Sequence, residues 1–367
     1  MHLWNDIEYR LDIQYQETNV TNMPDDLSIH VIPGRVPDPR VAIDEAIEAE
    51  RLGLKRVWLP ERYSNKEAGV TLSAIAAKTD HIGVGTGPLT LGARPPLVTA
   101  AIGATLHSFY GPRFTLGVGR GDPTWARAHG MRQLSYRALV DTCRIIKQLW
   151  RGETVVYDGP AGKYDGIKLE DRPDGPIPKI TMFHFGGPAA SVAAADPVFD
   201  EVGFSIMLRP EAMRDSIAIT AKECERIGRD PDAIHYIAPV ASACELSDDD
   251  TLMLIAARIV IYLQVPEVGN TFMARNDWDP KVRDKICSHP LFADMKTKLA
   301  DGSFHRHELL EVAKLVPDAW LHEVAAVGSV DECVKKLRDF QATGCAEIDL
   351  YSSSPAQNRS LIEAWGK

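Results

Sequence analysis

Three short segments of this sequence combine reactive side chains with glycine or proline, and each follows an apolar run typical of a strand. The first, Val57-Trp-Leu-Pro-Glu-Arg62, places a carboxylate, Glu61, next to a guanidinium, Arg62. A catalytic pair and a plain surface ion pair are equally good interpretations of these two neighbours.

The second segment is Gly85-Thr-Gly-Pro-Leu-Thr90, at the end of an expected strand. Gly87 and Pro88 so close to a strand end indicate either a plain tight turn or a bulge against which a flat ring could rest. The bond between them is open to the cis form, because an X-Pro bond favours trans by only ~1 kcal/mol.

The third segment runs from Arg113 to Asp122 and includes Gly119 and Gly121. Residues without side chains at a strand end let a ligand approach the backbone closely. No helix is expected to begin within the segment, so it is not a dinucleotide-binding fingerprint. Asp122 stands in the exit loop of the strand, where a general acid would be needed.

A regular alternation of strands and helices is expected to position these segments. Eight apolar runs read as strands, at 28–32, 56–59, 81–86, 113–118, 177–183, 201–206, 233–241 and 346–351. Amphipathic helices are expected at 39–52, 70–78, 95–109, 135–150, 188–195, 210–227, 251–264 and 330–342. The alternation predicts an α/β fold with a parallel sheet, and eight units predict closure into a (β/α)8 TIM barrel. The alternative, a doubly wound sheet, lacks its Gly-rich turn after the first strand.

Within this plan, residues 1–26 are predicted to form an N-terminal arm and residues 27–367 a single barrel domain. Two insertions are expected near the C-terminal face of the barrel, where the active sites of such folds lie. Residues 152–176 read as a hairpin, and residues 265–326 are irregular and rich in His and Pro. The second insertion is expected to form a lid that selects the substrate. A segment that stabilises the fold or forms an oligomer contact is the alternative.

Composition excludes several other classes of function. A net charge of −10 argues against a nucleic-acid partner, because phosphate recognition needs clustered Lys and Arg. The six cysteines form no CxxC or CxxH pair, so neither a metal site nor a dithiol motif is expected. No signal peptide and no apolar run of the ~18 residues that a membrane span needs are recognisable. A soluble, cytoplasmic protein is therefore expected.

Taken together and in order, the motifs resemble those of the luciferase-like superfamily. The resemblance is carried by Gly111-Pro-Arg-Phe-Thr-Leu-Gly-Val-Gly-Arg-Gly121, Gln148-Leu-Trp-Arg-Gly-Glu153 and Gly186-Gly-Pro-Ala-Ala190. Pro60-Glu-Arg-Tyr-Ser-Asn-Lys-Glu-Ala68 is similar to the branch of that superfamily that depends on coenzyme F420.

This resemblance implies roles for particular residues. Asp122 would donate a proton near the deazaflavin ring, and a bulge at Gly87 and Pro88 would support that ring. The turn of Gly186, Gly187, Pro188, Ala189 and Ala190 would hold the cofactor phosphate. Glycine amides at the start of a helix suit a phosphate, although an ordinary helix start is the alternative.

One departure from the F420-dependent glucose-6-phosphate dehydrogenases concerns Arg62. Those enzymes carry a His beside the acid after the second strand, and the His acts as a base toward a sugar hydroxyl. Arg62 stays protonated and cannot act as a base, so sugar-phosphate oxidation is not expected. Arg62 suits a carboxylate or carbonyl oxygen, or an ion pair with Glu61.

The leading hypothesis is hydride transfer between C5 of F420 and a small organic substrate, by an enzyme expected to be a homodimer. Two alternatives stay open. One is an FMN-dependent luciferase-like monooxygenase, and the other is a non-catalytic barrel that binds a flavin or deazaflavin.

Overall fold

The structure, a computed structural model, describes residues 26–32, 34, 36, 38–62, 66–121, 123–172, 175–295 and 300–366. The side chain of Trp125 is outside this description. The predicted N-terminal arm, residues 1–26, lies outside the described residues apart from Asp26. Asp122 lies outside them as well.

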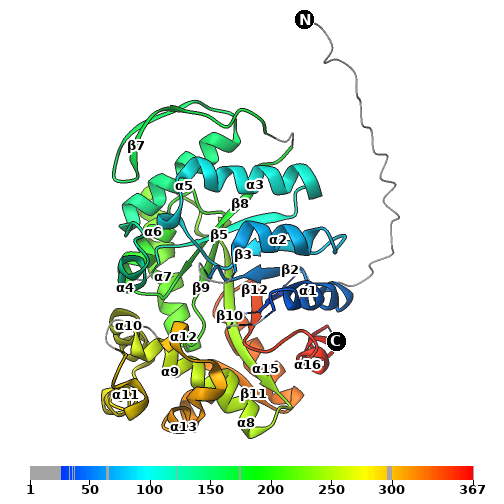
Figure 1. The fold of residues 1–367 in the computed structure, drawn as a ribbon, viewed down its shortest axis with the longest axis vertical. Coiled ribbons are helices and arrows are strands. Elements are labelled where there is room, and N and C mark those ends of the chain that lie inside the picture. The colour runs from blue at the N-terminus through cyan, green and yellow to red at the C-terminus, as the bar shows by residue number, and fades with distance from the viewer. Residues whose placement is uncertain are drawn as a thin grey trace, which may run out of the picture.

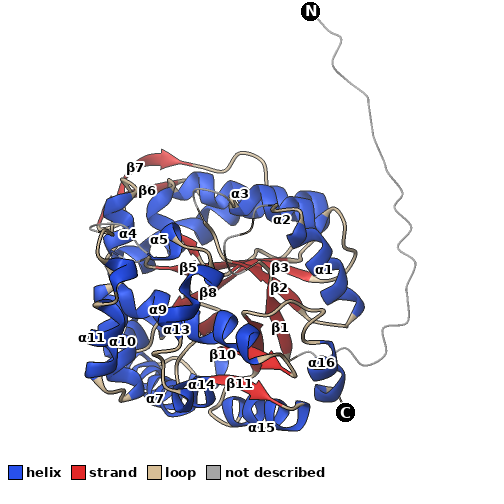
Figure 2. Ribbon diagram, turned by 60° about the horizontal axis from the view of Figure 1, so that its bottom comes forward, coloured by secondary structure: helices blue, strands red, loops and turns tan. Residues whose placement is uncertain are grey.

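Eight parallel strands of the described chain close into a ring, with helices around it (Figures 1 and 2). In ring order these strands are β1 (Leu27–His30), β2 (Arg56–Leu59), β3 (Gly83–Thr86), β5 (Phe114–Gly119), β8 (Lys179–His184), β9 (Glu201–Phe204), β10 (His235–Cys244) and β12 (Glu347–Tyr351). Pairing of β1 with β12 and of β9 with β10 closes the ring. The predicted (β/α)8 barrel is confirmed, and each expected strand segment overlaps one of these strands.

The outer helices are α1 (Val41–Arg51), α2 (Ala68–Ala76), α3 (Pro96–Tyr110), α5 (Tyr136–Trp150), α6 (Pro188–Ala194), α7 (Pro210–Ile227), α15 (Val330–Gln341) and α16 (Arg359–Trp365). Helix α5 illustrates how they are built. Its start is capped by Ser135, whose hydroxyl accepts a bond from the Ala138 amide, and its apolar face is buried. Trp150 at its end donates to the Ala100 carbonyl of α3 at 2.8 Å, which ties two neighbouring helices together.

The connection from β10 to α15 is the longest in the barrel and consists mainly of short helices. It comprises α8 (Asp248–Thr251), a π-helical turn (Leu252–Ala256), α9 (Ala257–Gln264), α10 (Pro266–Asn276), α11 (Pro280–Cys287), α12 (Ala300–Ser303), the 3-10 turn η5 (Arg306–Leu309), α13 (Leu310–Ala313), α14 (Asp318–Val324) and the added strand β11 (Ala325–Gly328). Helix α15 packs against β10, β11 and β12, so it is the barrel helix of this unit. The helix expected at 251–264 therefore belongs to the inserted segment.

No single helix of the described chain is both long enough and apolar enough to cross a membrane. Helices α8–α9 (Asp248–Leu263) and α10 reach this length and apolarity only as a pair, bent by 114°.

The hairpin expected within 152–176 is present as β6 (Val155–Gly159) and β7 (Gly162–Ile167). It lies against α5, where the Tyr157 hydroxyl donates to Asp141 at 2.8 Å. Its tip is held by Arg132, which donates to the Ala161 carbonyl at 2.6 Å. None of its residues lines the main cavity.

A buried ion network closes the amino-terminal end of the barrel. Arg56, the first residue of β2, donates to Glu347 of β12 at 2.6 Å and to Glu201 of β9 at 2.8 Å. The pKa of the Arg56 guanidinium is raised: burial opposes its charge, but the two carboxylates outweigh burial. The pKa of Glu347 is held well below its usual range by Arg56, with His235 adding a hydrogen bond. Three strands are thus joined across the barrel at the end opposite its mouth.

Candidate functional site

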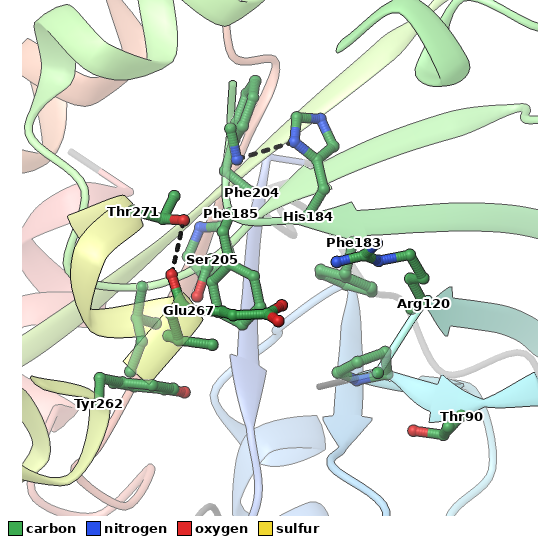
Figure 3. Close-up of a pocket in the computed structure, with 18 of the residues that line it drawn as sticks. Thr90, Arg120, Phe183, His184, Phe185, Phe204, Ser205, Tyr262, Glu267 and Thr271 are labelled. Atoms are coloured by element: carbon green, nitrogen blue, oxygen red, sulfur yellow. Dashed lines mark hydrogen bonds between the residues drawn. The ribbon is translucent and has the colours of Figure 1, made fainter. Parts of the chain in front are cut away.

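A cavity opens at the carboxyl ends of the barrel strands, and the empty space between its walls, including open solvent at its mouth, is about 1100 Å³. Its floor and one wall come from β1, β5, β8, β9, β10 and β12 and from the segment that follows β3, and the facing wall comes from α9 and α10. Figure 3 shows Thr90 and Arg120 on one side and Tyr262, Glu267 and Thr271 on the other. Aromatic rings contribute much of the lining, namely Tyr136, Phe183, Phe185, Phe204, Tyr262 and Tyr351. A cleft lined largely by apolar and aromatic side chains with a few polar groups suits cofactors and small ligands.

Gly87 and Pro88 form a ledge on the cavity wall. They separate β3 from the short strand β4 (Leu89–Thr90). Both strands pair with β5. The bond between them is cis, the form that the sequence left open for this X-Pro bond. A Cβ at position 87 would lie 2.5 Å from Nε2 of His30, so the ledge has room only for glycine.

His30 also lines the cavity, in contact with this ledge, and was not singled out in the sequence. Its Nε2 contacts the Gly87 carbonyl oxygen at 2.9 Å, and its Nδ1 contacts the Asp349 carboxylate at 2.6 Å. Both side chains are almost fully buried, and burial raises the pKa of the Asp349 carboxyl. His30 therefore couples the first and last strands of the barrel to the position of the ledge.

The glycines predicted after β5 also lie on the cavity. Gly119 and Gly121 line it, and Gly121 has a φ of 77°, which favours glycine. Arg120 between them stacks on the Tyr136 ring, with its guanidinium carbon 4.9 Å from the ring centroid. Asp122, the predicted proton donor, is the next residue and lies outside the described chain.

Residues 186–190 span the turn after β8 and the start of α6. Gly186 lines the cavity, whereas Gly187, Pro188, Ala189 and Ala190 lead into or form the first turn of the helix and lie beyond the lining. Gly186 and Gly187 have φ values of 77° and 90°. Arg275 of α10 reaches this turn, because its Nε would be 3.3 Å from a Cβ at position 186. That Nε is buried and has no hydrogen-bond partner among the described residues.

His184, the last residue of β8, is a second cavity residue that the sequence did not single out. Its Nδ1 accepts a bond from the Gly186 amide at 2.9 Å, so in the neutral ring Nε2 carries the proton. The pKa of His184 is lowered to about 4, first by burial and then by the nearby charge of Arg275. Nε2 has no partner within the described chain, which leaves a buried donor beside the cavity.

Glu61 and Arg62 do not line the cavity, and each bonds to a residue other than its neighbour. Arg94 donates to Glu61, and Arg62 donates to Asp301 of α12. Arg62 also exchanges two backbone hydrogen bonds with Lys66, at 3.2 and 2.8 Å. The assigned roles of Glu61 and Arg62 in catalysis remain predictions.

The inserted segment contributes the facing wall through Tyr262, Glu267, Val268 and Thr271. Thr271 donates to the Glu267 carbonyl at 2.9 Å within α10. The sequence indicated a segment near the mouth but no individual residue, because these side chains stand on helices of ordinary composition. Over the described residues, no group of three His, Cys, Asp or Glu could hold a metal ion.

A closed (β/α)8 barrel whose strand ends surround an aromatic cavity has the architecture of a barrel enzyme. The chain belongs to the luciferase-like monooxygenase family, which matches residues 20–347. The predicted family and the predicted class, an oxidoreductase, are confirmed at this level.

The chain is similar to several enzymes of named activity. The chain is 24% identical over 324 residues to a 5,10-methylenetetrahydromethanopterin reductase of Methanolobus tindarius, spanning 87% of this chain and 92% of that protein. It is 32% identical over 166 residues to an F420-dependent glucose-6-phosphate dehydrogenase of Kineococcus radiotolerans, spanning 42% of this chain and 49% of that protein. The structure of a coenzyme F420-dependent tetrahydromethanopterin reductase of Methanopyrus kandleri superimposes with a TM-score of 0.76 at 19% identity, covering 93% of this chain and 97% of that one.

Proposed function

We propose that this protein is an F420-dependent oxidoreductase that transfers a hydride between C5 of the deazaflavin and a small organic substrate. The observation that carries the proposal is the ledge of Gly87 and Pro88 in a cavity walled by aromatic rings at the strand ends. The relatives named above for their use of F420 support the choice of cofactor.

The residues present fit such a cofactor. A flat ring would lie against Gly87, Pro88 and Gly119, where side chains do not block access to the backbone. The unpartnered Nε of Arg275 beside Gly186 suits the phosphate-bearing part of the molecule. The buried Nε2–H donor of His184 offers one more polar contact on the same side.

Bound there, F420 would supply a carbon that carries or accepts the hydride. The chain's own residues would hold ring and substrate in register, which is most of what such a transfer requires. Phe183, Phe204 and Ile206 would exclude water from the reacting face. Asp122 would supply or accept the accompanying proton at its carboxyl group. His30 would act as a positioning residue, because its Nε2 holds the carbonyl of the ledge.

A second candidate is an FMN-dependent monooxygenase with the same fold. It is favoured by structural neighbours such as the oxygenating component of 3,6-diketocamphane monooxygenase in complex with FMN, which superimposes with a TM-score of 0.60 at 19% identity. A non-catalytic barrel that binds a flavin or deazaflavin is the remaining alternative. The homodimer and the cytoplasmic location stay predictions, which sedimentation and fractionation would test.

Anaerobic single-turnover measurements test the proposed reaction. The protein is mixed with reduced F420 and, in turn, with activated alkenes, imines and carbonyl compounds, and cofactor oxidation is followed by absorbance. We expect oxidation with at least one substrate class and none without substrate. Oxygen consumption with reduced FMN, combined with no oxidation of reduced F420 by any substrate, would support the monooxygenase instead.

A further inference from the structure

Four basic side chains gather beside the cavity, and apart from the predicted role of Arg62 they have no part in the proposed hydride transfer. This cationic cluster consists of Arg62, Lys66, Arg258 and Arg306. Arg62 and Lys66 follow β2, Arg258 lies on α9, and Arg306 begins η5. Lys66 and Arg258 are only 2% exposed, and the side chain of Arg62 is 11% exposed.

Among the described residues, two carboxylates face these four cations. Asp301 accepts from Arg62 and lies 3.5 Å from a guanidinium nitrogen of Arg258. Glu45 accepts from the Ile32 amide at 2.7 Å and is electrostatically coupled to Lys66 and Arg306. The undescribed residues nearest in the sequence, 33, 35, 37, 63–65 and 296–299, include no Asp or Glu. Over the described residues, three guanidinium groups face two carboxylates here, so positive charge is in excess even when the Lys66 amine is neutral. Such an excess is costly at a buried place unless an anion compensates it.

Burial and the excess of positive charge together lower the pKa values of two of these side chains. The pKa of Lys66 falls to about 6, first through burial and then through Arg62 and Arg258. The pKa of Arg306 falls to about 9, first through burial and then through Arg258. Arg306 donates to the Ser352 carbonyl at 3.3 Å, but its Nη2 is buried without a partner among the described residues.

The cluster adjoins the cavity directly. The guanidinium carbon of Arg258 lies 5.7 Å from the centroid of the Tyr351 ring, and Tyr351 lines the cavity. Tyr262, another lining residue, lies one helical turn beyond Arg258 on α9 and is electrostatically coupled to Arg258, Asp301 and Arg62. A group of the substrate that extends past the two tyrosines would meet the cluster.

We propose that the cationic cluster is the subsite for an anionic group of the substrate, a carboxylate or a phosphate, and that Asp301 is the internal anion that this group displaces. Guanidinium groups bind both oxyanions through paired N–H donors, and Asp301 already bridges two of them. Because it assigns a class of substrate, this inference rests on the proposed function. The occupancy of the subsite by an oxyanion does not require the cofactor.

Calorimetric titration of the cofactor-free protein with inorganic phosphate and with malonate tests the subsite. We expect wild type to bind at least one anion, Asp301→Asn to bind it about tenfold or more tightly, and Arg306→Met to lose most of the affinity. Arg226→Met, on the exposed face of α7, is the matched control and should bind as wild type does. Preference for phosphate or for malonate identifies the anion class.

Thermal unfolding of the same variants shows whether each of them is folded. Asp301→Asn should be less stable than wild type and should gain more in Tm from the anion, because its cations lack their internal partner. The proposal is overturned if neither anion binds, if Asp301→Asn binds no more tightly, or if Arg306→Met binds as wild type does. Loss of F420 binding with retained anion binding would instead remove only the proposed function.

Proton uptake gives an independent readout. Lys66 faces Arg62, Arg258, Arg306, Asp301 and Glu45, and with a pKa of about 6 it is mostly neutral at pH 7.5. A bound anion favours the charged amine, so binding at this pH should be accompanied by measurable proton uptake. Titrations in two buffers of different ionisation enthalpy measure the uptake, which Lys66→Met should abolish. Equal uptake by wild type and Lys66→Met would contradict the role of Lys66.

Discussion

At the scale of single residues, some of the cavity residues at strand ends could be predicted from the sequence and others could not. Gly87, Gly119 and Gly121 could be found because glycines directly after an apolar run mark a place where a ligand can reach the backbone. His30 and Asp349 could not, because they are 319 residues apart and meet only when the first and last strands pair. Nothing local distinguishes such a His from an ordinary core residue.

Asp122 carries the proton-transfer step of the proposed mechanism. Asp122→Asn removes the ionisable group while keeping its size, so turnover should fall by a factor on the order of 10² or more. The affinity for F420 should stay within about twofold, because the ring rests on the ledge. Steady-state rates and a cofactor titration measure both quantities. Unchanged turnover would remove Asp122 from the mechanism.

His184 makes stability depend on pH. Its pKa is about 4 when folded and roughly 6.5 when unfolded, so below pH 6.5 the unfolded chain takes up a proton that the folded chain does not. Stability is therefore lost as the pH falls, by about 2 kcal/mol at pH 5. Urea unfolding at pH 7.5 and pH 5 should show this loss in wild type and a smaller one in His184→Gln. An equal loss in both proteins would show that His184 is not responsible.

At the scale of elements, the barrel strands were predictable and the long insertion was not. Buried parallel strands are short apolar runs between turn residues, and all eight stand out in this way. The helices from α11 to α14 have four to eight residues each, too few for a periodic pattern to emerge. The helix at 251–264 has a clear pattern, but its apolar face packs within the inserted segment and not as the barrel helix of its unit.

The ledge between β3 and β4 is the element on which the cofactor would depend. Gly87→Ala would place its Cβ 2.5 Å from Nε2 of His30 and 2.9 Å from Cβ of Trp58. We expect a loss of about 1–3 kcal/mol in stability from this overpacking and at least about tenfold weaker F420 binding. Gly366→Ala, whose Cβ meets no atom within 4 Å, is the control. Wild-type F420 affinity in Gly87→Ala would show that the ledge does not support the ring.

At the scale of the whole molecule, two clusters of buried charged side chains lie at opposite ends of the barrel. The network of Arg56, Glu201 and Glu347 ties three strands together at the amino-terminal end. The cationic cluster lies at the carboxyl-terminal mouth with its positive charge only partly balanced. Eight alternating units predicted the barrel from the sequence, but neither group could be foreseen, because the partners come from strands and insertions far apart in the chain.

Breaking the network at the amino-terminal end should reduce stability without altering the site. Arg56→Met leaves two buried carboxylates without their shared partner and should cost about 3–5 kcal/mol. F420 affinity of the remaining folded protein should be unchanged, because the cavity lies at the other end of the strands. Denaturant unfolding and a cofactor titration at low temperature measure the two effects. A variant as stable as wild type would contradict the structural role of the network.

The central claim is that the cavity on the Gly87–Pro88 ledge holds a deazaflavin. Titration of the purified protein with F420 and, separately, with FMN tests it most directly, with binding followed by fluorescence. The account predicts a submicromolar dissociation constant for F420 and no measurable binding of FMN. Tight binding of FMN without binding of F420 would contradict it.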